Sequence, residues 1–159
     1  MPESTLRTDE DFGKFYERHR EYVYRLCLTY MKTHADAEDC TEDVFVRVLT
    51  RKPAFSDDIH ARKWLTVTAC NHCKNKLKRR KLIETVPLYD VPEPAEEDTE
   101  NDVLSAVMSL PPRYKDVVWM YYYEGYSTDE IASLLHRPAS TVRNRLKDAR
   151  EMLRKHLED

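Results

Sequence analysis

Near the end of the chain, the residues Ser127-Thr-Asp-Glu-Ile-Ala-Ser-Leu-Leu-His-Arg-Pro-Ala-Ser-Thr-Val-Arg-Asn-Arg-Leu-Lys-Asp-Ala-Arg150 have the pattern of two short helices. Ser127 or Thr128 can cap a helix whose apolar residues recur at helical spacing. Pro138 interrupts this pattern because proline removes a backbone donor, and a second, basic helix is expected to restart after Ser140. Two short helices joined by a tight turn favour a helix-turn-helix that lays its second helix in the major groove of DNA. An amphipathic pair in an ordinary bundle is the alternative.

The composition favours an all-α fold. The chain of 159 residues has only two glycines, and its long stretches of Glu, Lys, Arg, Leu and Ala favour helices. No apolar run is long enough to cross a membrane, and the N-terminal residues lack the apolar core of a signal peptide. We therefore expect an all-helical, cytoplasmic protein without membrane insertion.

Charge is segregated along the chain. The net charge is −3, but residues 82–102 hold eight of the 29 acids, three prolines and no Lys or Arg, which leaves 21 acids against 26 basic residues elsewhere. Such a composition favours neither a helix nor a packed core, so we expect a flexible acidic linker there. The linker divides the chain into two small helical domains, residues 1–81 and residues 103–159.

The N-terminal domain is expected to contain three helices. Apolar residues recur at intervals of three and four over residues 9–32, and the same pattern predicts a helix over residues 35–51. Pro53 then marks a loop over residues 52–59, and a third helix is expected over residues 60–81.

The second of these helices carries acids beyond its first turn. Acids in a first turn suit the helix dipole, but Glu42 and Asp43 lie further along. They are next to an apolar stripe that consists of Val44, Phe45, Val48 and Leu49. A helix surface that is both acidic and apolar favours docking to a basic partner.

The third helix ends in a basic run. Six of the eight residues in 74–81 are Lys or Arg. Such density is unfavourable through self-repulsion unless a polyanion is nearby. A basic tip that is only solvated is the alternative.

The C-terminal domain is expected to form a four-helix unit. Pro111 and Pro112 end its first helix, and the next contains Trp119 and a run of tyrosines. Gly125 provides a helix C-cap before the helix-turn-helix. Trp119 and the tyrosines are expected to supply most of the apolar area of a small core.

The four cysteines are Cys27, Cys40, Cys70 and Cys73. In a cytosolic protein they are expected to be reduced and buried. Cys70 and Cys73 have metal-ligand or redox spacing, with His72 between them, but a structural zinc site usually needs a second pair of ligands. The chain also lacks a glycine-rich phosphate loop and a catalytic arrangement supported by spacing. We therefore expect no metal, no cofactor and no catalytic residue.

Three separated signatures together resemble the extracytoplasmic-function (ECF, group IV) class of bacterial RNA polymerase sigma factors. The first is Asp36-Ala-Glu-Asp-Cys-Thr-Glu-Asp-Val-Phe-Val46, and the second is Trp64-Leu-Thr-Val-Thr-Ala-Cys-Asn71 followed by the basic run. The third consists of Leu110-Pro-Pro-Arg-Tyr114, Tyr126-Ser-Thr-Asp-Glu-Ile-Ala132 and residues 141–150. The resemblance spans nearly the whole chain. One departure is His136, which stands where the family often has glycine.

The resemblance implies a role for each signature. The first would dock on core RNA polymerase through Asp36, Glu38, Asp39, Glu42, Asp43 and Phe45. The second would hold the −10 element of promoter DNA through Asn71, Lys74, Asn75, Lys78, Arg79 and Arg80, with help from the preceding loop. The third would read the −35 element through Ser140, Thr141, Arg143, Asn144, Arg145 and Lys147. Arg143 is our first choice for a bidentate contact with guanine, and Arg145 is our second.

The resemblance also implies a regulatory partner, because members of the family are commonly held by an anti-sigma factor. A stand-alone helix-turn-helix transcription regulator is the alternative function. That alternative explains the C-terminal domain but leaves the acidic and basic helices of the N-terminal domain without a purpose.

Overall fold

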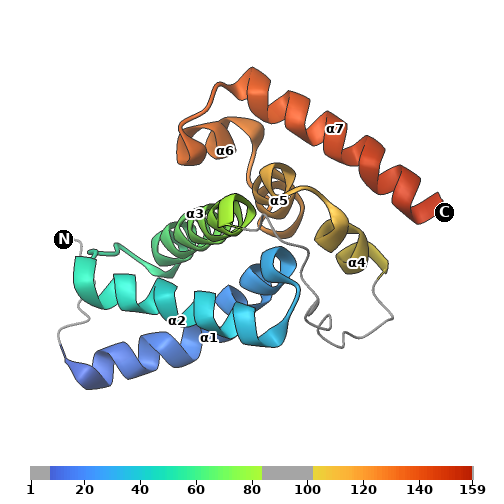
Figure 1. Ribbon diagram of the computed structural model, residues 1–159. Helices are drawn as coiled ribbons and strands as arrows, with labels where there is room; N and C mark the ends of the chain where they lie inside the picture. Colours follow the sequence, from blue (N-terminus) through green and yellow to red (C-terminus); the bar gives the residue numbers. More distant parts are fainter. Residues whose placement is uncertain (1–7, 84–101, 159) are drawn as a thin grey trace. The chain divides into compact units, whose positions relative to one another are not determined.

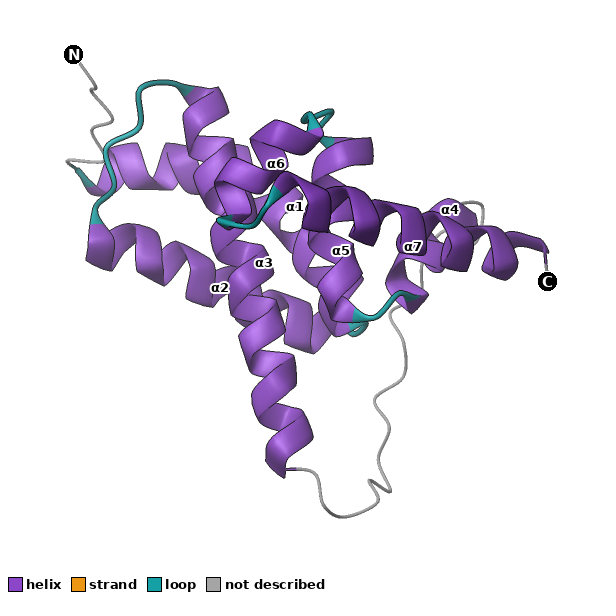
Figure 2. Cartoon of the chain, turned by 90° about the horizontal axis from the view of Figure 1, so that it is seen from above, coloured by secondary structure: helices purple, strands orange, loops and turns teal. Residues whose placement is uncertain are grey.

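The computed structural model describes residues 8–83 and 102–158. Within these residues, Figure 2 shows helices joined by loops and no strand, so the predicted all-α fold is confirmed. The described helices belong to two compact units, α1–α3 and α4–α7 (Figure 1). Most of the predicted linker lies outside the described residues. No helix in the described part of the chain combines the length and the apolar character needed to span a membrane.

The first unit begins with α1 (Asp9–Met31) and α2 (His34–Arg51), which pack against each other. Thr8 and Thr33 cap the two helices, and each side chain accepts a hydrogen bond from a backbone N–H of the first turn. Lys32 has a left-handed backbone with φ of 69°, which ends α1 one residue before the predicted boundary.

The third helix, α3 (Asp58–Ile83), begins before and ends after its predicted bounds. Its early start has a local cause, because the Asp57 carboxylate accepts the backbone N–H of His60 at 2.7 Å and acts as an N-cap. The connecting loop is therefore residues 52–57, which is shorter than the loop predicted over residues 52–59.

The core of the first unit lies where all three helices meet. Phe55 of the connecting loop is buried too, and its ring stacks on that of Phe15 at a centroid distance of 5.6 Å. The buried apolar residues of the helices include Val23, Leu26, Cys27, Tyr30, Ala37, Cys40, Val44, Phe45, Val48, Leu65, Ala69, Cys70 and Cys73. The opposite sides of α2 and α3 remain exposed and are available for binding.

The second unit contains α4 (Asp102–Ser109), α5 (Pro112–Val118), the π-helical turn η1 (Trp119–Tyr123), α6 (Thr128–Leu135) and α7 (Ala139–Glu158). α5 begins with a proline, which is favourable at the first position of a helix because no donor is lost there. η1 follows α5 without a break. The long helix α7 contacts α4, α5 and α6.

Helices α6 and α7 form the predicted helix-turn-helix. Ser127 and Glu130 make a reciprocal capping box at the start of α6. His136 ends that helix with a φ of 53°, a left-handed conformation that glycine adopts most easily. The Pro138 carbonyl accepts the N–H of Val142 at 3.2 Å, so α7 begins directly after this proline rather than after Ser140.

The core of the second unit uses fewer tyrosines than predicted. Trp119 is buried, but Tyr122 and Tyr123 are 51% and 43% exposed. A π-helical turn contains one residue more than an α-helical turn, and this shifts the residues that follow around the axis. Aliphatic side chains fill most of the core, and they include Val107, Leu110, Val117, Val118, Met120, Ile131, Val142 and Leu146.

Candidate functional site

The exposed side of α2 is acidic in its first half and apolar in its second. Glu38, Asp39, Glu42, Val46 and Leu49 are all exposed. They share one side because an α-helix turns by about 100° per residue. The two apolar side chains are 53% and 49% exposed, although such side chains are usually buried. We call these five residues the α2 surface. In the sequence, the helical spacing from Glu42 to Val46 and Leu49 predicts that these side chains share one side of the helix.

Phe45 lies on the buried side of α2. It is only 2% exposed, and its ring centroid lies 6.4 Å from that of Phe12, 6.1 Å from that of Phe15 and 4.8 Å from that of Tyr16. The sequence analysis assigned Phe45 to the docking contact. That assignment does not fit the structure, because the enclosed ring has almost no surface to offer a partner. Phe45 instead holds α2 against α1.

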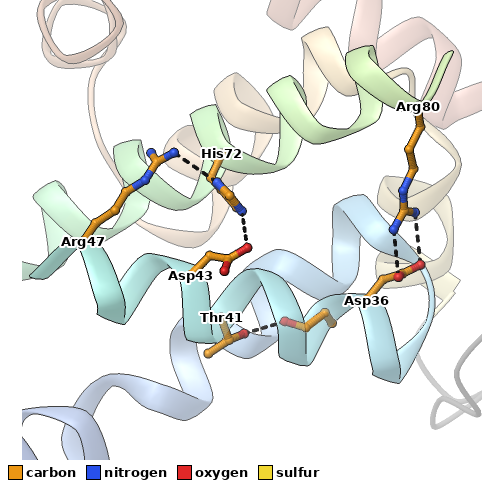
Figure 3. Close-up of polar contacts among 7 residues, drawn as sticks. Asp36, Thr41, Asp43, Arg47, His72 and Arg80 are labelled. Atoms are coloured by element: carbon orange, nitrogen blue, oxygen red, sulfur yellow. Dashed lines mark hydrogen bonds and ion pairs between the residues drawn. The ribbon is translucent and has the colours of Figure 1, made fainter. Parts of the chain in front are cut away.

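Asp36 and Arg80 form a bidentate ion pair between α2 and α3 (Figure 3). The two guanidinium nitrogens of Arg80 donate to the two carboxylate oxygens of Asp36 at 2.8 and 3.1 Å. The hydrogen bonds from Arg80 lower the pKa of Asp36, although partial burial opposes this effect. Arg80 follows Lys78 by two residues, or about 200° around the helix, so it points away from Lys78, whereas Lys76 shares its side of α3 and also lowers the pKa of Asp36.

Replacing Asp36 by Asn is expected to lower the free energy of unfolding of the first unit by about 1 kcal/mol near neutral pH. Because the folded-state pKa is depressed, the contribution of the pair is present above the ordinary carboxylate pKa and is lost as the pH falls through the lower folded-state value. Urea unfolding at neutral pH measures the stability with the ion pair present. Unfolding below about pH 3 measures the stability after the pair is lost. Asp39→Asn is the matched control at an exposed acid. Equal stability of Asp36→Asn and the wild type at neutral pH would contradict the expectation.

His72 forms a second polar link between the same helices. Arg47 Nη2 lies 3.2 Å from His72 Nδ1, and because a guanidinium has no acceptor, Nδ1 accepts this hydrogen bond. His72 Nε2 then carries the proton and donates to an Asp43 carboxylate oxygen at 2.9 Å (Figure 3). The imidazole is 6% exposed. The Asp43 side chain is still 50% exposed, so Asp43 links α2 to α3 from the edge of the interface, while the Asp36 side chain is 20% exposed.

The outer side of α3 presents amides and cations. Asn71, Asn75, Lys78 and Arg79 are exposed, and Lys74 is half-buried. These five of the six residues predicted for the −10 element are brought together along one helix. The sixth, Arg80, is turned toward α2.

The loop before α3 brings a cluster of aromatic rings next to that helix. Phe55 lies 5.7 Å from the ring centroid of Trp64 and 5.6 Å from that of His60, both with edge-on geometry. Trp64 is half-buried in this cluster. Its packing contributes to the position of the loop relative to α3.

The cysteines pack inside the first unit as predicted. All four are buried and none is disulfide-bonded. Cys73 donates a hydrogen bond that lowers the pKa of the Cys40 thiol, and His72 lowers it further, while the pKa of Cys73 is raised by its bonds to Cys27 and Cys40. No group of three or more metal-ligating side chains is found in residues 8–83 or 102–158.

Helix α7 presents a polar side next to its N-terminus. Ser140, Arg143, Asn144 and Lys147 are exposed at spacings of three and four residues. The other two residues predicted for the −35 element, Thr141 and Arg145, are half-buried. They line a hollow between α5 and α7 together with Arg113, and Asn144 of the exposed group borders this hollow too. The structure therefore divides the six predicted residues into an exposed group and a flanking group.

Two protein families match the chain. Residues 15–83 match Sigma-70 region 2, and residues 100–153 match Sigma-70, region 4. The first match contains the α2 surface and the outer side of α3. The second contains the helix-turn-helix.

Two curated relatives cover most of the chain. It is 26% identical to the ECF RNA polymerase sigma factor SigW of Bacillus subtilis over 95% of this chain and 91% of that protein. It is 30% identical to the ECF RNA polymerase sigma factor SigM of Mycobacterium tuberculosis over 89% of this chain and 74% of that protein.

Two solved sigma factors have a similar fold. RpoE of Bartonella quintana, in complex with the anti-sigma factor NepR, has a TM-score of 0.72 and 17% identity over 94% of this chain and 98% of that one. CnrH, in complex with the cytosolic domain of CnrY, has a TM-score of 0.63 and 20% identity over 96% of this chain and 90% of that one.

The fold and these surfaces define a DNA-binding transcription protein that contains sigma-70 regions 2 and 4. The chain belongs to the extracytoplasmic-function RNA polymerase sigma factors. It binds core RNA polymerase and promoter DNA, and it directs promoter recognition in transcription initiation. Sigma factors are non-enzymatic initiation factors.

Proposed function

We propose that the α2 surface is the part of the chain that docks on core RNA polymerase. Glu38, Asp39 and Glu42 provide negative charge for a basic partner, while Val46 and Leu49 provide apolar area that docking would bury. Asp39 makes no hydrogen bond or ion pair with another described residue, so its carboxylate is available to the partner. Asp36 and Phe45 hold α2 against the rest of the unit, and Asp43 is bound to His72 at the edge of this surface.

The outer side of α3 is proposed to hold the melted −10 element. The amides of Asn71 and Asn75 can hydrogen-bond to the pairing edges of unstacked bases. Lys74, Lys78 and Arg79 can bind backbone phosphates, which positions the strand without specifying its sequence. Arg80 anchors α3 to α2 and is left out of the DNA contact.

The exposed group on α7 is proposed to read the −35 element in the major groove. Ser140, Arg143, Asn144 and Lys147 would face base edges and the nearest phosphates. In this arrangement residues 1–81 form the −10 and polymerase-binding domain, residues 103–159 form the −35 domain, and residues 82–102 tether them.

One observation carries the proposal, namely the separation of charge within the three-helix unit. Exposed acids lie on one side of α2, where Glu38 is near Arg20 and Glu42 accepts a hydrogen bond from Tyr16, whereas cations lie on the outer side of α3. A helix-turn-helix regulator that acts alone on duplex DNA needs neither surface. A protein that bridges polymerase and a DNA strand needs both.

Replacing Arg143 by Ala is expected to reduce discrimination between the −35 element and a scrambled duplex by about 5- to 150-fold. This range corresponds to the 1–3 kcal/mol that a bidentate contact with guanine contributes. Fluorescence anisotropy with both duplexes at fixed salt measures the ratio. Arg154→Ala removes the same charge from an exposed position further along α7 and is the control. A loss of equal size on both duplexes would show that Arg143 contacts only phosphate.

An anti-sigma factor is proposed as the regulatory partner. The support is structural similarity to RpoE and CnrH, whose solved complexes contain NepR and a domain of CnrY. The same exposed surfaces that bind polymerase and DNA would be covered in such a complex. A binding competition tests this proposal. A partner captured by the purified chain is expected to compete with core RNA polymerase for binding to that chain.

Transcription in vitro tests the whole proposal. The purified chain and core RNA polymerase are incubated with a pool of genomic DNA, and the 5′ ends of the transcripts are mapped. New start sites that share −35 and −10 sequences are expected. A chain that binds duplex DNA but leaves the start sites of core polymerase unchanged would favour the stand-alone regulator.

A further inference from the structure

Two of the three acids on the α2 surface are in contact with α1. Tyr16 Oη donates a hydrogen bond to Glu42 Oε1 at 2.5 Å, and Arg20 Nη2 lies 4.0 Å from Glu38 Oε1. Asp39 makes no hydrogen bond or ion pair with another described residue. The acids of this surface therefore differ in how firmly the fold holds their carboxylates.

The contact to Glu42 is part of a chain of hydrogen bonds with one direction. Arg20 Nε lies 3.1 Å from Tyr16 Oη, and because a guanidinium has no acceptor, Arg20 donates to this oxygen. The single proton of the Tyr16 hydroxyl is then directed at Glu42, whose carboxylate can only accept. The bond to Glu42 is the main reason that the pKa of Tyr16 is raised, so the hydroxyl keeps this proton.

The ring of Tyr16 has a fixed position. It is half-buried, and its centroid lies 4.8 Å from that of Phe45 and 6.2 Å from that of Phe12. Phe45 itself is 2% exposed and belongs to the core of the unit. The hydroxyl of Tyr16 is therefore a rigid anchor for Glu42, an exposed side chain that would otherwise sample several rotamers.

Only one oxygen of the Glu42 carboxylate is occupied by this contact. Glu42 Oε2 makes no hydrogen bond with another described residue. A carboxylate that is held through one oxygen still presents the other oxygen, and its negative charge, to a cationic side chain. The arrangement therefore orients Glu42 without removing it from the exposed side of α2.

We propose that Tyr16 of α1 is a positioning residue for polymerase docking, because it holds the Glu42 carboxylate in the orientation that a basic side chain of core RNA polymerase binds. The inference rests on the proposed docking role of the α2 surface. Ordering a flexible side chain at an interface opposes binding, and Tyr16 has already restricted Glu42 in the free protein. The alternative is a bond that only fastens α1 to α2.

The first measurement is the affinity of the full chain for immobilised core polymerase. Tyr16→Phe keeps the ring and the net charge but removes the hydroxyl that holds Glu42. It is expected to weaken binding by about 2- to 12-fold, which is the equivalent of ordering one flexible side chain. Because no charge changes, the salt dependence of binding is expected to match that of the wild type.

A double-mutant cycle distinguishes positioning from a purely structural role. Glu42→Ala removes the carboxylate that Tyr16 holds, so adding Tyr16→Phe to this variant is expected to cause no further loss of affinity. Asp39→Asn is the matched control, because it changes an acid that Tyr16 does not contact. Adding Tyr16→Phe to Asp39→Asn is expected to cause the full loss of about 2- to 12-fold.

Nuclear magnetic resonance tests the contact itself in the free chain. With tyrosine labelled by ¹³C at Cζ, the Tyr16 signal is the one that is missing from Tyr16→Phe. It is expected to titrate at a lower pH in Glu42→Ala than in the wild type, because the hydrogen bond to Glu42 raises the pKa of Tyr16. Hydrogen exchange in peptides from α1 and α2 is expected to be the same in Tyr16→Phe and the wild type.

The inference is overturned if Tyr16→Phe binds polymerase as tightly as the wild type or more tightly. It is also overturned if the loss is equally large in the Glu42→Ala variant, or if the Tyr16 titration does not depend on Glu42. If Glu38→Arg with Asp39→Arg still abolishes binding in these cases, the α2 surface docks on polymerase without this positioning. If that double variant also leaves the affinity unchanged, the proposed docking surface itself fails.

Discussion

Reversing two charges with Glu38→Arg and Asp39→Arg is expected to weaken association with core RNA polymerase by at least about 100-fold. Each reversal replaces an attraction by a repulsion, and like charges that meet across an interface cost several kcal/mol. A loss of about 2.7 kcal/mol already corresponds to 100-fold. Both side chains are exposed on α2, so the fold is expected to tolerate the change. Biolayer interferometry with immobilised core polymerase measures the dissociation constant.

The matched control is Glu17→Arg with Glu21→Arg on α1. It changes the net charge by the same amount at two exposed positions of the same unit, but away from the α2 surface. This control is expected to bind core polymerase within about threefold of the wild type. Any remaining difference would come from long-range electrostatics, which salt screens. Equal losses in the two double variants would mean that total charge, rather than the α2 surface, governs docking.

Phe45→Ala is expected to destabilise the first unit by about 3–5 kcal/mol, because it removes a fully enclosed ring and leaves a cavity. The total stability of a domain is often only about 5–15 kcal/mol, so this substitution would remove a large fraction of the free energy of unfolding of the unit. Hydrogen exchange of the full chain, read in peptides from α1–α3, measures the change locally. Peptides from α4–α7 serve as an internal reference.

The neighbouring substitution Val46→Ala gives the opposite pattern. Val46 is 53% exposed, so its truncation is expected to change stability by less than about 0.5 kcal/mol while it weakens polymerase binding. If Phe45 were instead a docking residue, Phe45→Ala would leave hydrogen exchange unchanged and reduce only the binding.

Local chemistry made most helix boundaries predictable. Ser127 with Glu130, and Gly125 with its φ of 72°, mark helix ends through interactions that involve residues a few positions apart. His136 ends α6 in a left-handed conformation as well, although it is not a glycine. Such signals depend only on neighbouring residues, so they can be read without the fold.

Some local features were missed because the same residues are compatible with two different local structures. Asp57 looks like a loop residue in sequence, yet its carboxylate caps α3. The run Trp119–Tyr123 has helical spacing, but the N–H of Glu124 bonds to the Trp119 carbonyl at 3.1 Å and closes a π-helical turn. That turn leaves Tyr122 and Tyr123 on the surface, where the spacing alone placed them in the core.

Periodicity, caps and motif order are local or sequential properties, so they were enough to predict the all-helical class, the helix-turn-helix and the family. Which charged side chains remain available for binding depends on how the helices pack. Asp36 and Arg80 are 44 residues apart, and Asp43 and His72 are 29 residues apart, so no spacing rule links them. Packing of α2 against α3 brings these pairs together, and it leaves Asp39, Lys78 and the apolar Val46 facing outward.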